Sequence, residues 1–149
     1  MLQIYRWIKI SVGIVPIDSS VQLTMKWLKE IQEEFKWPDM DRVYDATKAV
    51  LQATRDRLTV EEAHQFAAQI PMVMKGMFFD GYDPTDKPLR IRDKDKFLEH
   101  VRNHFGDNPL DSEAAVRTVA KVLRKKISPG QYEDVVGSMP KDIKGLYLE

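Results

Sequence analysis

The chain has 149 residues, 43% of them hydrophobic and 31% charged, which is typical of an ordinary globular domain. Its 23 basic and 23 acidic residues balance, which excludes a strong overall field for nucleic acid or acidic lipid. The absence of cysteine excludes disulfides, thiolate metal sites and a cysteine nucleophile.

The first 17 residues form an apolar segment that contains Arg6 and Lys9. Apolar side chains occupy alternate positions from Leu2 to Ile14, which is the spacing of a β-strand. The segment is shorter than the roughly 20 apolar residues of a membrane-spanning helix and lacks a signal-peptide cleavage site. We therefore expect a short strand or extended arm; membrane contact and an extension from an upstream start are the alternatives.

Apolar residues at helical spacing predict four helices in the first half. Pro16 is expected to end the arm, and Asp18, Ser19 or Ser20 to cap the first helix. The predicted segments are about 18–37, Asp41–Leu58 with Asp39 or Asp41 as cap, Val60–Gln69, and a short helix with Pro71 in its first turn that buries Val73, Met74, Met77 and Phe78. Thr59 and Glu62 have the spacing of a capping box.

The second half shows the same order of signals. Asp93 is expected to cap a helix that ends near Gly106, and Asp111 or Ser112 to cap the next one. Ser128 and Gln131 predict a second capping box, and Pro140 opens the last helix.

These parallels predict an internal repeat of about 70 residues. The sequence QIPMVMKGMFF at 69–79 returns as SMPKDIKGLYL at 138–148, with proline and the Lys-Gly pair in equivalent places. We therefore predict an all-α fold: a pseudo-symmetric bundle of about eight helices forming one domain over residues 18–149. It consists of repeat 18–80, linker 81–92 and repeat 93–149, and residues 1–17 lie outside it.

One pair of histidines has metal-ligand spacing. His100 and His104 are four residues apart and so share one face of a helix, where two imidazoles can chelate one ion. Asp107 is a conceivable third ligand. His64 is expected on the surface. The carboxylate pairs and serines at helix starts are interpreted as caps, not as catalytic groups.

Basic side chains and the linker are the candidate interaction surfaces. The second and sixth predicted helices each carry a row of Lys and Arg that could follow a phosphate backbone. The linker places Tyr82 among charged residues, either as a structural aromatic that packs over the junction of the repeats or as part of a recognition loop. The candidate interaction residues are Tyr82, Arg90, Arg92, Arg117, Lys121, Arg124 and Lys125, together with Arg42, Lys48, Arg55 and Arg57 in the first repeat.

Residues 18–149 resemble the bacterial domain of unknown function 2267 family. The resemblance is most specific at Arg55–Ala63, at Gln69–Pro71 and at Phe79–Pro84. Asp80 and Tyr82 are mild departures, because the family usually has glutamate and tryptophan there. The resemblance implies a helical fold in a bacterial, cytoplasmic protein, and it brings no catalytic residues.

The functional hypothesis is a non-enzymatic helical module that binds a protein, itself included, without a cofactor. It is motivated by the short apolar element that contains Met72, Met77 and Phe79, which has more apolar residues than one buried stripe needs. One alternative is a nucleic-acid-associated protein that uses the two basic helices. Another is a metal-dependent enzyme built around His100 and His104.

Overall fold

Helix α3 lies at the centre of an all-α fold. The computed structural model describes residues 11–149, which form eight helices and no strand. The helices are α2 (Val15–Phe35), α3 (Met40–Asp56), α4 (Val60–Ala67), α5 (Met72–Phe79), α6 (Lys94–Phe105), α7 (Ser112–Lys126), α8 (Pro129–Gly137) and α9 (Lys141–Leu148). The all-α class and the eight helices were both predicted from the sequence.

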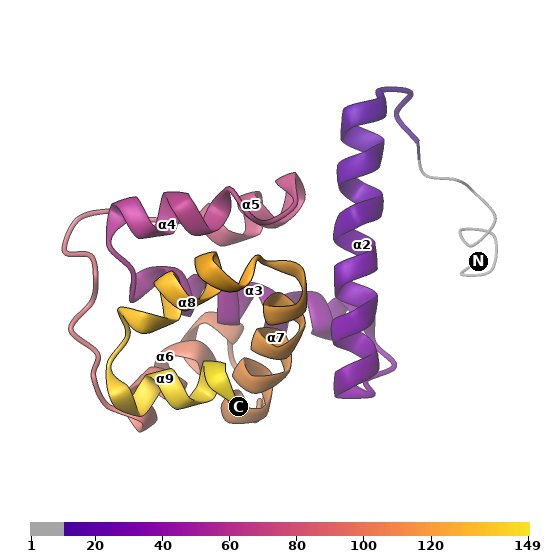
Figure 1. Ribbon diagram of the computed structural model, residues 1–149. Coiled ribbons are helices and arrows are strands. Elements are labelled where there is room, and N and C mark those ends of the chain that lie inside the picture. The colour runs from indigo at the N-terminus through magenta and orange to yellow at the C-terminus, as the bar shows by residue number, and fades with distance from the viewer. Residues whose placement is uncertain (1–10) are drawn as a thin grey trace.

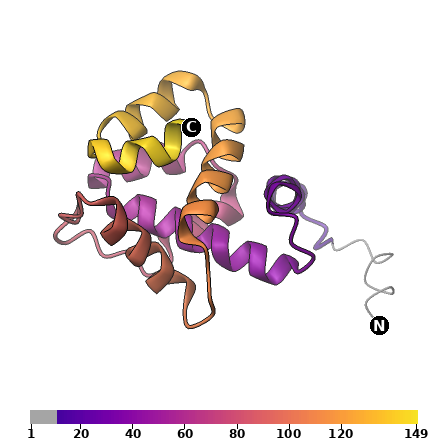
Figure 2. The same cartoon turned by 90° about the horizontal axis from the view of Figure 1, so that it is seen from below.

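Helix α3 packs against α2, α5, α6 and α7, and helix α7 packs against α2, α6 and α9. Figures 1 and 2 show α4 and α5 on one side of this pair and α8 and α9 on another. The core is continuous, with fully buried Phe78, Phe97 and Leu51 at its centre. None of the described helices combines the length and apolar character needed to cross a membrane.

Helix α2 stands at the edge of the bundle, upright in Figure 1 and seen end-on in Figure 2. Its buried residues are Thr24, Trp27, Leu28 and Ile31, so only its C-terminal half packs against the core. Its first nine residues, Val15–Leu23, are exposed or partly exposed.

The start of α2 corrects the predicted arm. Pro16 does not end an extended segment: it lies in the first turn of the helix, where its missing N–H would be unpaired anyway. Asp18 is not the cap. Its carboxylate accepts hydrogen bonds from Ser11 Oγ at 2.8 Å and from the Val12 amide at 2.9 Å. The predicted strand falls largely on residues 1–10, which lie outside the described residues.

Of the two predicted capping boxes, one is confirmed and one is wrong. Thr59 and Glu62 form the capping box, with Thr59 Oγ1 accepting from the Glu62 amide. The box at Ser128 was wrong, because its side chain makes no cap hydrogen bond. There Pro129 in the first turn already removes one amide that would need a partner.

The prolines predicted inside two first turns instead directly precede their helices. Pro71 and Pro140 have ψ of 154° and 149°, which is extended backbone, and α5 and α9 begin one residue later. Val73 was wrongly predicted to be buried. It is 39% exposed, because Met74, Met77 and Phe78 occupy the face of α5 that meets the core.

Candidate functional site

The last turn of α3 concentrates buried charge. Arg55, Asp56 and Arg57 are consecutive, and they are only 3%, 4% and 9% exposed. Charged side chains are seldom this buried unless they have partners. The partners come from α5, α6 and the linker, so this turn joins the two halves of the chain.

Arg55 ties the end of α3 to the end of α5. Its Nη1 donates to the carbonyl oxygens of Phe78 at 2.9 Å and Asp80 at 3.1 Å. Its guanidinium carbon lies 5.1 Å from the centre of the Tyr82 ring, within the range of a cation–π contact. Its Nε donates to Asp56 Oδ1 at 2.9 Å, which fixes the orientation of that carboxylate.

The other oxygen of Asp56 faces two imidazoles. Asp56 Oδ2 lies 2.8 Å from His100 Nε2 and 3.0 Å from His104 Nε2, and both rings come from α6. Burial alone would raise the pKa of Asp56, but hydrogen bonds from both histidines and from Arg55 outweigh it and hold that pKa far below its usual range. The carboxylate is therefore ionised at neutral pH. We call Asp56, His100 and His104 the aspartate–histidine cluster.

The cluster differs from the predicted ligand set in its third member. The sequence placed Asp107 beside His100 and His104, whereas the structure brings Asp56 to them. Asp107 is exposed and follows Gly106, whose φ of 106° turns the chain away from α6. Helical spacing identified the histidines, but Asp56 is 44 residues from His100, and only the packing of α6 on α3 brings them together.

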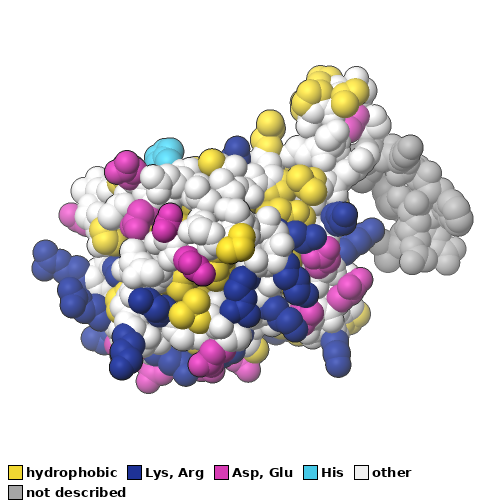
Figure 3. All heavy atoms as spheres, viewed as in Figure 1, with side chains coloured by type: hydrophobic (Ala, Val, Ile, Leu, Met, Phe, Trp, Pro, Cys, Tyr) yellow, Lys and Arg dark blue, Asp and Glu magenta, His cyan; other side chains and the backbone are white. Residues whose placement is uncertain are grey.

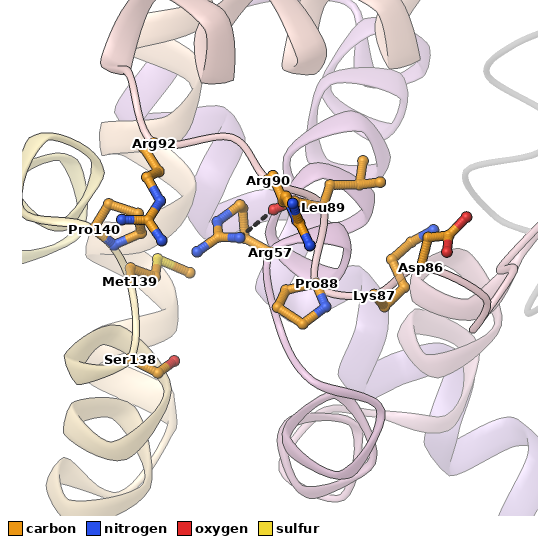
Figure 4. Close-up of a pocket in the computed structure, with 10 residues that line it drawn as sticks. All are labelled: Arg57, Asp86, Lys87, Pro88, Leu89, Arg90, Arg92, Ser138, Met139 and Pro140. Atoms are coloured by element: carbon orange, nitrogen blue, oxygen red, sulfur yellow. Dashed lines mark hydrogen bonds between the residues drawn. The ribbon is translucent and has the colours of Figure 1, made fainter.

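A groove of about 790 Å³ lies on the other side of the turn, between the linker and the chain segment before α9. Its basic residues are Arg57, Lys87, Arg90 and Arg92, and its one acidic residue is Asp86; the remaining lining is Pro88, Leu89, Ser138, Met139 and Pro140. We call it the cationic groove. Figure 4 shows the guanidinium groups of Arg57, Arg90 and Arg92 gathered between the linker and Met139 and Pro140. Lys and Arg side chains also gather at the left edge of Figure 3, over the linker.

Arg57 is the most deeply buried charge of this groove. It donates from Nη1 to the carbonyl oxygen of Leu89, while its buried Nε has no hydrogen-bond partner among residues 11–149. Burial lowers the pKa of Arg57, the neighbouring charge of Arg92 lowers it further, and the negative charge of Glu62 offsets this only in part. Within the described chain, Arg57, Arg90 and Arg92 form no ion pair with a carboxylate.

Tyr82 does not line the groove. Its ring packs 5.6 Å from that of Phe79 and lies close to Arg55 and Lys87. Its hydroxyl oxygen is buried without a hydrogen-bond partner in the described part of the chain. Tyr82 therefore packs inward against Phe79 and Arg55.

The basic row on α7 is largely engaged within the molecule. Arg117 pairs with Glu113 and Glu149, Lys121 pairs with Glu34, and Arg124 donates to the carbonyl oxygen of Leu148. Lys125 is exposed.

The row on α3 behaves similarly. Lys48 pairs with Asp80, and Arg42 donates to the Pro109 carbonyl and stacks over Trp37. Arg55 is buried. The two rows therefore do not present a continuous set of free cations.

Comparison with known proteins identifies a family and no characterised relative. No curated protein matches the chain. A family match covers residues 24–146, from the middle of α2 to a point two residues before the end of α9. The matched region includes both the aspartate–histidine cluster and the cationic groove. The chain therefore belongs to the family described as uncharacterized conserved protein (DUF2267).

Proposed function

We propose that the protein is a non-enzymatic helical binding module whose cationic groove receives an acidic segment of a partner protein. The observation that carries this proposal is Arg57, a charged side chain that is 9% exposed, has a single hydrogen bond and lies beside the like charge of Arg92. Such an arrangement is unfavourable, and because the charge of Glu62 offsets it only in part, a bound anion would stabilise it. A carboxylate between the two guanidinium groups would accept hydrogen bonds from both.

The shape of the groove favours a short peptide over a nucleic acid. Its walls include Pro88, Leu89 and Met139, which suit apolar side chains next to the acidic ones. A polynucleotide needs a longer track of free cations, and the basic rows on α3 and α7 are mostly paired with carboxylates and carbonyls of the same chain.

Reversing the charges of the two exposed arginines of the groove tests the proposal. We expect the full chain to bind a short fluorescein-labelled peptide of alternating glutamate and leucine, and Arg90→Glu with Arg92→Glu to weaken that binding at least about tenfold, measured by fluorescence anisotropy. The double variant Lys29→Glu, Lys96→Glu changes the net charge equally at exposed sites on α2 and α6, and it should bind like the parent chain.

Two outcomes would contradict the proposal. One is equal loss of binding in both double variants, which would indicate a general charge effect. The other is tighter binding of a single-stranded DNA of matched charge than of the peptide, which would favour the nucleic-acid alternative.

Self-association is a second candidate, favoured by the projecting half of α2. Exposed apolar side chains gather there and at the start of α5: Val12, Ile14, Val15, Ile17, Leu23, Met25, Met72 and Val73. The two elements are joined by a hydrogen bond from the Val73 amide to Ser20 Oγ. Figure 3 shows apolar side chains at the projecting end of α2. A second copy could cover this surface with its own, as in a twofold dimer.

Sedimentation velocity tests this interface. We expect the parent chain to sediment as a dimer and Leu23→Lys with Met72→Lys to sediment as a monomer, because two buried lysines oppose the contact. Val60→Lys replaces an exposed apolar residue on α4 and should leave the dimer intact. A monomeric parent chain, or a dimer in the double variant, would contradict this interface.

The internal repeat also belongs to the proposal, with residues 18–80 and 93–149 as its two copies. Helices α3, α4 and α5 have 17, 8 and 8 residues, and α7, α8 and α9 have 15, 9 and 8. The ion pair between Lys48 and Asp80 has a counterpart 69 residues later between Arg117 and Glu149. These parallels support a shared ancestry of the two halves. The groove lies where the linker joins them.

A further inference from the structure

We infer that the aspartate–histidine cluster is a binding site for a divalent cation of the zinc type. Its three ligand atoms, Asp56 Oδ2, His100 Nε2 and His104 Nε2, all lie within 4.8 Å of one another. The site is separate from the cationic groove, and the inference does not depend on what that groove binds.

The three ligands are held in place before an ion arrives. His100 and His104 project from one face of α6, and Asp56 projects toward them from α3. Arg55 holds Oδ1 of the carboxylate, so Oδ2 is the oxygen directed at the rings. Arg55 is itself fixed by the carbonyl of Phe78. Such outer contacts orient ligands in metal sites.

The carboxylate of the site is buried, whereas the two imidazole rings are partly exposed to solvent. The Asp56 side chain is 5% exposed, and those of His100 and His104 are 21% and 22% exposed. An ion can therefore reach the ring nitrogens from solvent, while the carboxylate lies at the inner end of the site. Three protein ligands leave a fourth position for water.

The donor set selects the kind of ion. Two imidazole nitrogens and one carboxylate oxygen suit borderline cations such as Zn²⁺, Co²⁺ and Fe²⁺ rather than Ca²⁺ or Mg²⁺, which prefer oxygen ligands. Tetrahedral zinc with bonds of about 2.1 Å separates its ligands by roughly 3.4 Å. The present separations of 2.8 and 3.0 Å between Oδ2 and the two Nε2 atoms need to widen by only a few tenths of an ångström.

Another pair of helices in the molecule shows that a polar contact between helices does not require histidine. Helix α2 is joined to α7 by two ion pairs, Glu30 with Lys126 at 2.7 Å and Glu34 with Lys121 at 2.9 Å. At the contact between α3 and α6, two imidazoles take the place of such permanently charged groups. Imidazole nitrogen can ligate a metal at neutral pH, which a lysine ammonium does not do.

Calorimetric titration of the full chain with zinc chloride tests the inference. We expect one Zn²⁺ per chain and an affinity at least about tenfold lower in His100→Ala and in His104→Ala. His64→Ala is the matched control: it removes the chain's third histidine, which is exposed on α4, and should leave the affinity unchanged. Co²⁺ in place of zinc should give visible absorption that both cluster variants lose.

His100→Gln guards against a folding defect, because glutamine can still donate to Asp56 but is a poor zinc ligand. It should keep the circular dichroism spectrum of the parent chain and lose zinc affinity. Absence of binding to the parent chain at millimolar zinc would overturn the inference. So would equal affinity in His64→Ala and the cluster variants, because binding would then lie elsewhere.

Discussion

Replacing Asp56 by alanine is expected to lower the free energy of unfolding by about 3–5 kcal/mol, the usual cost of breaking a buried ion pair from one side. The Arg55 side chain, 4% exposed, would keep its charge and lose its carboxylate. His100 and His104 would lose their shared acceptor, which removes the polar contact between α3 and α6. The effect is measured by urea unfolding, monitored by circular dichroism. A chelator in the buffer ensures that no bound metal contributes to the stability.

The neighbouring ion pair of Lys48 and Asp80 supplies the control. The Asp80 side chain is 64% exposed, and exposed pairs contribute little to stability, so Asp80→Ala should leave the urea midpoint nearly unchanged. The double variant Arg55→Met, Asp56→Ala should be less destabilised than Asp56→Ala alone, because no unpaired charge stays buried. A midpoint for Asp56→Ala equal to that of Asp80→Ala would show that Asp56 is not the buried partner of Arg55.

Local chemistry explains why much of the fold could be predicted. Helix caps form between residues that are close in the sequence. The side chains of Thr59, Asp39 and Asp93 accept hydrogen bonds from amides two or three residues later, so these caps can be identified without knowledge of the tertiary structure. The start of α2 was misjudged because a proline can end an extended segment or begin a helix. The structure shows the second case at Pro16.

The candidate sites depend on packing, which local patterns do not contain. His100 and His104 are recognisable from their spacing alone, but their partner Asp56 is in another helix. Arg57 resembled one more cation of an exposed basic face. It is buried because the linker crosses the end of α3, where the Leu89 amide donates to the Asp56 carbonyl at 2.8 Å. That crossing depends on tertiary structure.

The aspartate–histidine cluster and the cationic groove are adjacent because both use residues at the end of α3. Asp56 faces α6, while Arg57, the next residue, faces the linker and the segment before α9. Anything that fixes Asp56, including a metal ion, also fixes the backbone that carries Arg57. Zinc binding and peptide binding can therefore be measured in the same chain and compared for mutual effects.

A second large effect is expected at alkaline pH from two buried tyrosines. Tyr147 Oη and Thr54 Oγ1 lie 2.6 Å apart, and Tyr132 Oη donates to the Tyr147 carbonyl at 2.5 Å. Burial raises the pKa of Tyr132 to about 12, and burial also raises the pKa of Tyr147 above its usual range.

The sign follows from proton binding. Above pH 10 the unfolded chain releases its tyrosine protons while the folded chain still holds them, so the free energy of unfolding falls as pH rises. The contribution is complete below pH 10 and is lost as pH passes through the folded pKa of about 12. A shift of this size corresponds to about 3 kcal/mol for Tyr132.

Urea unfolding at pH 8 and pH 12 should therefore show a smaller loss of stability with pH in Tyr132→Phe than in the parent chain. At pH 8 the same variant should lose only about 1 kcal/mol, the usual net value of one hydrogen bond. Tyr44→Phe, which removes a hydroxyl from a partly exposed side chain on α3, serves as the control and should follow the parent chain at both values of pH. Equal losses between pH 8 and pH 12 in the parent chain and in Tyr132→Phe would mean that other groups, such as lysines losing their charge, and not the Tyr132 phenol govern alkaline unfolding.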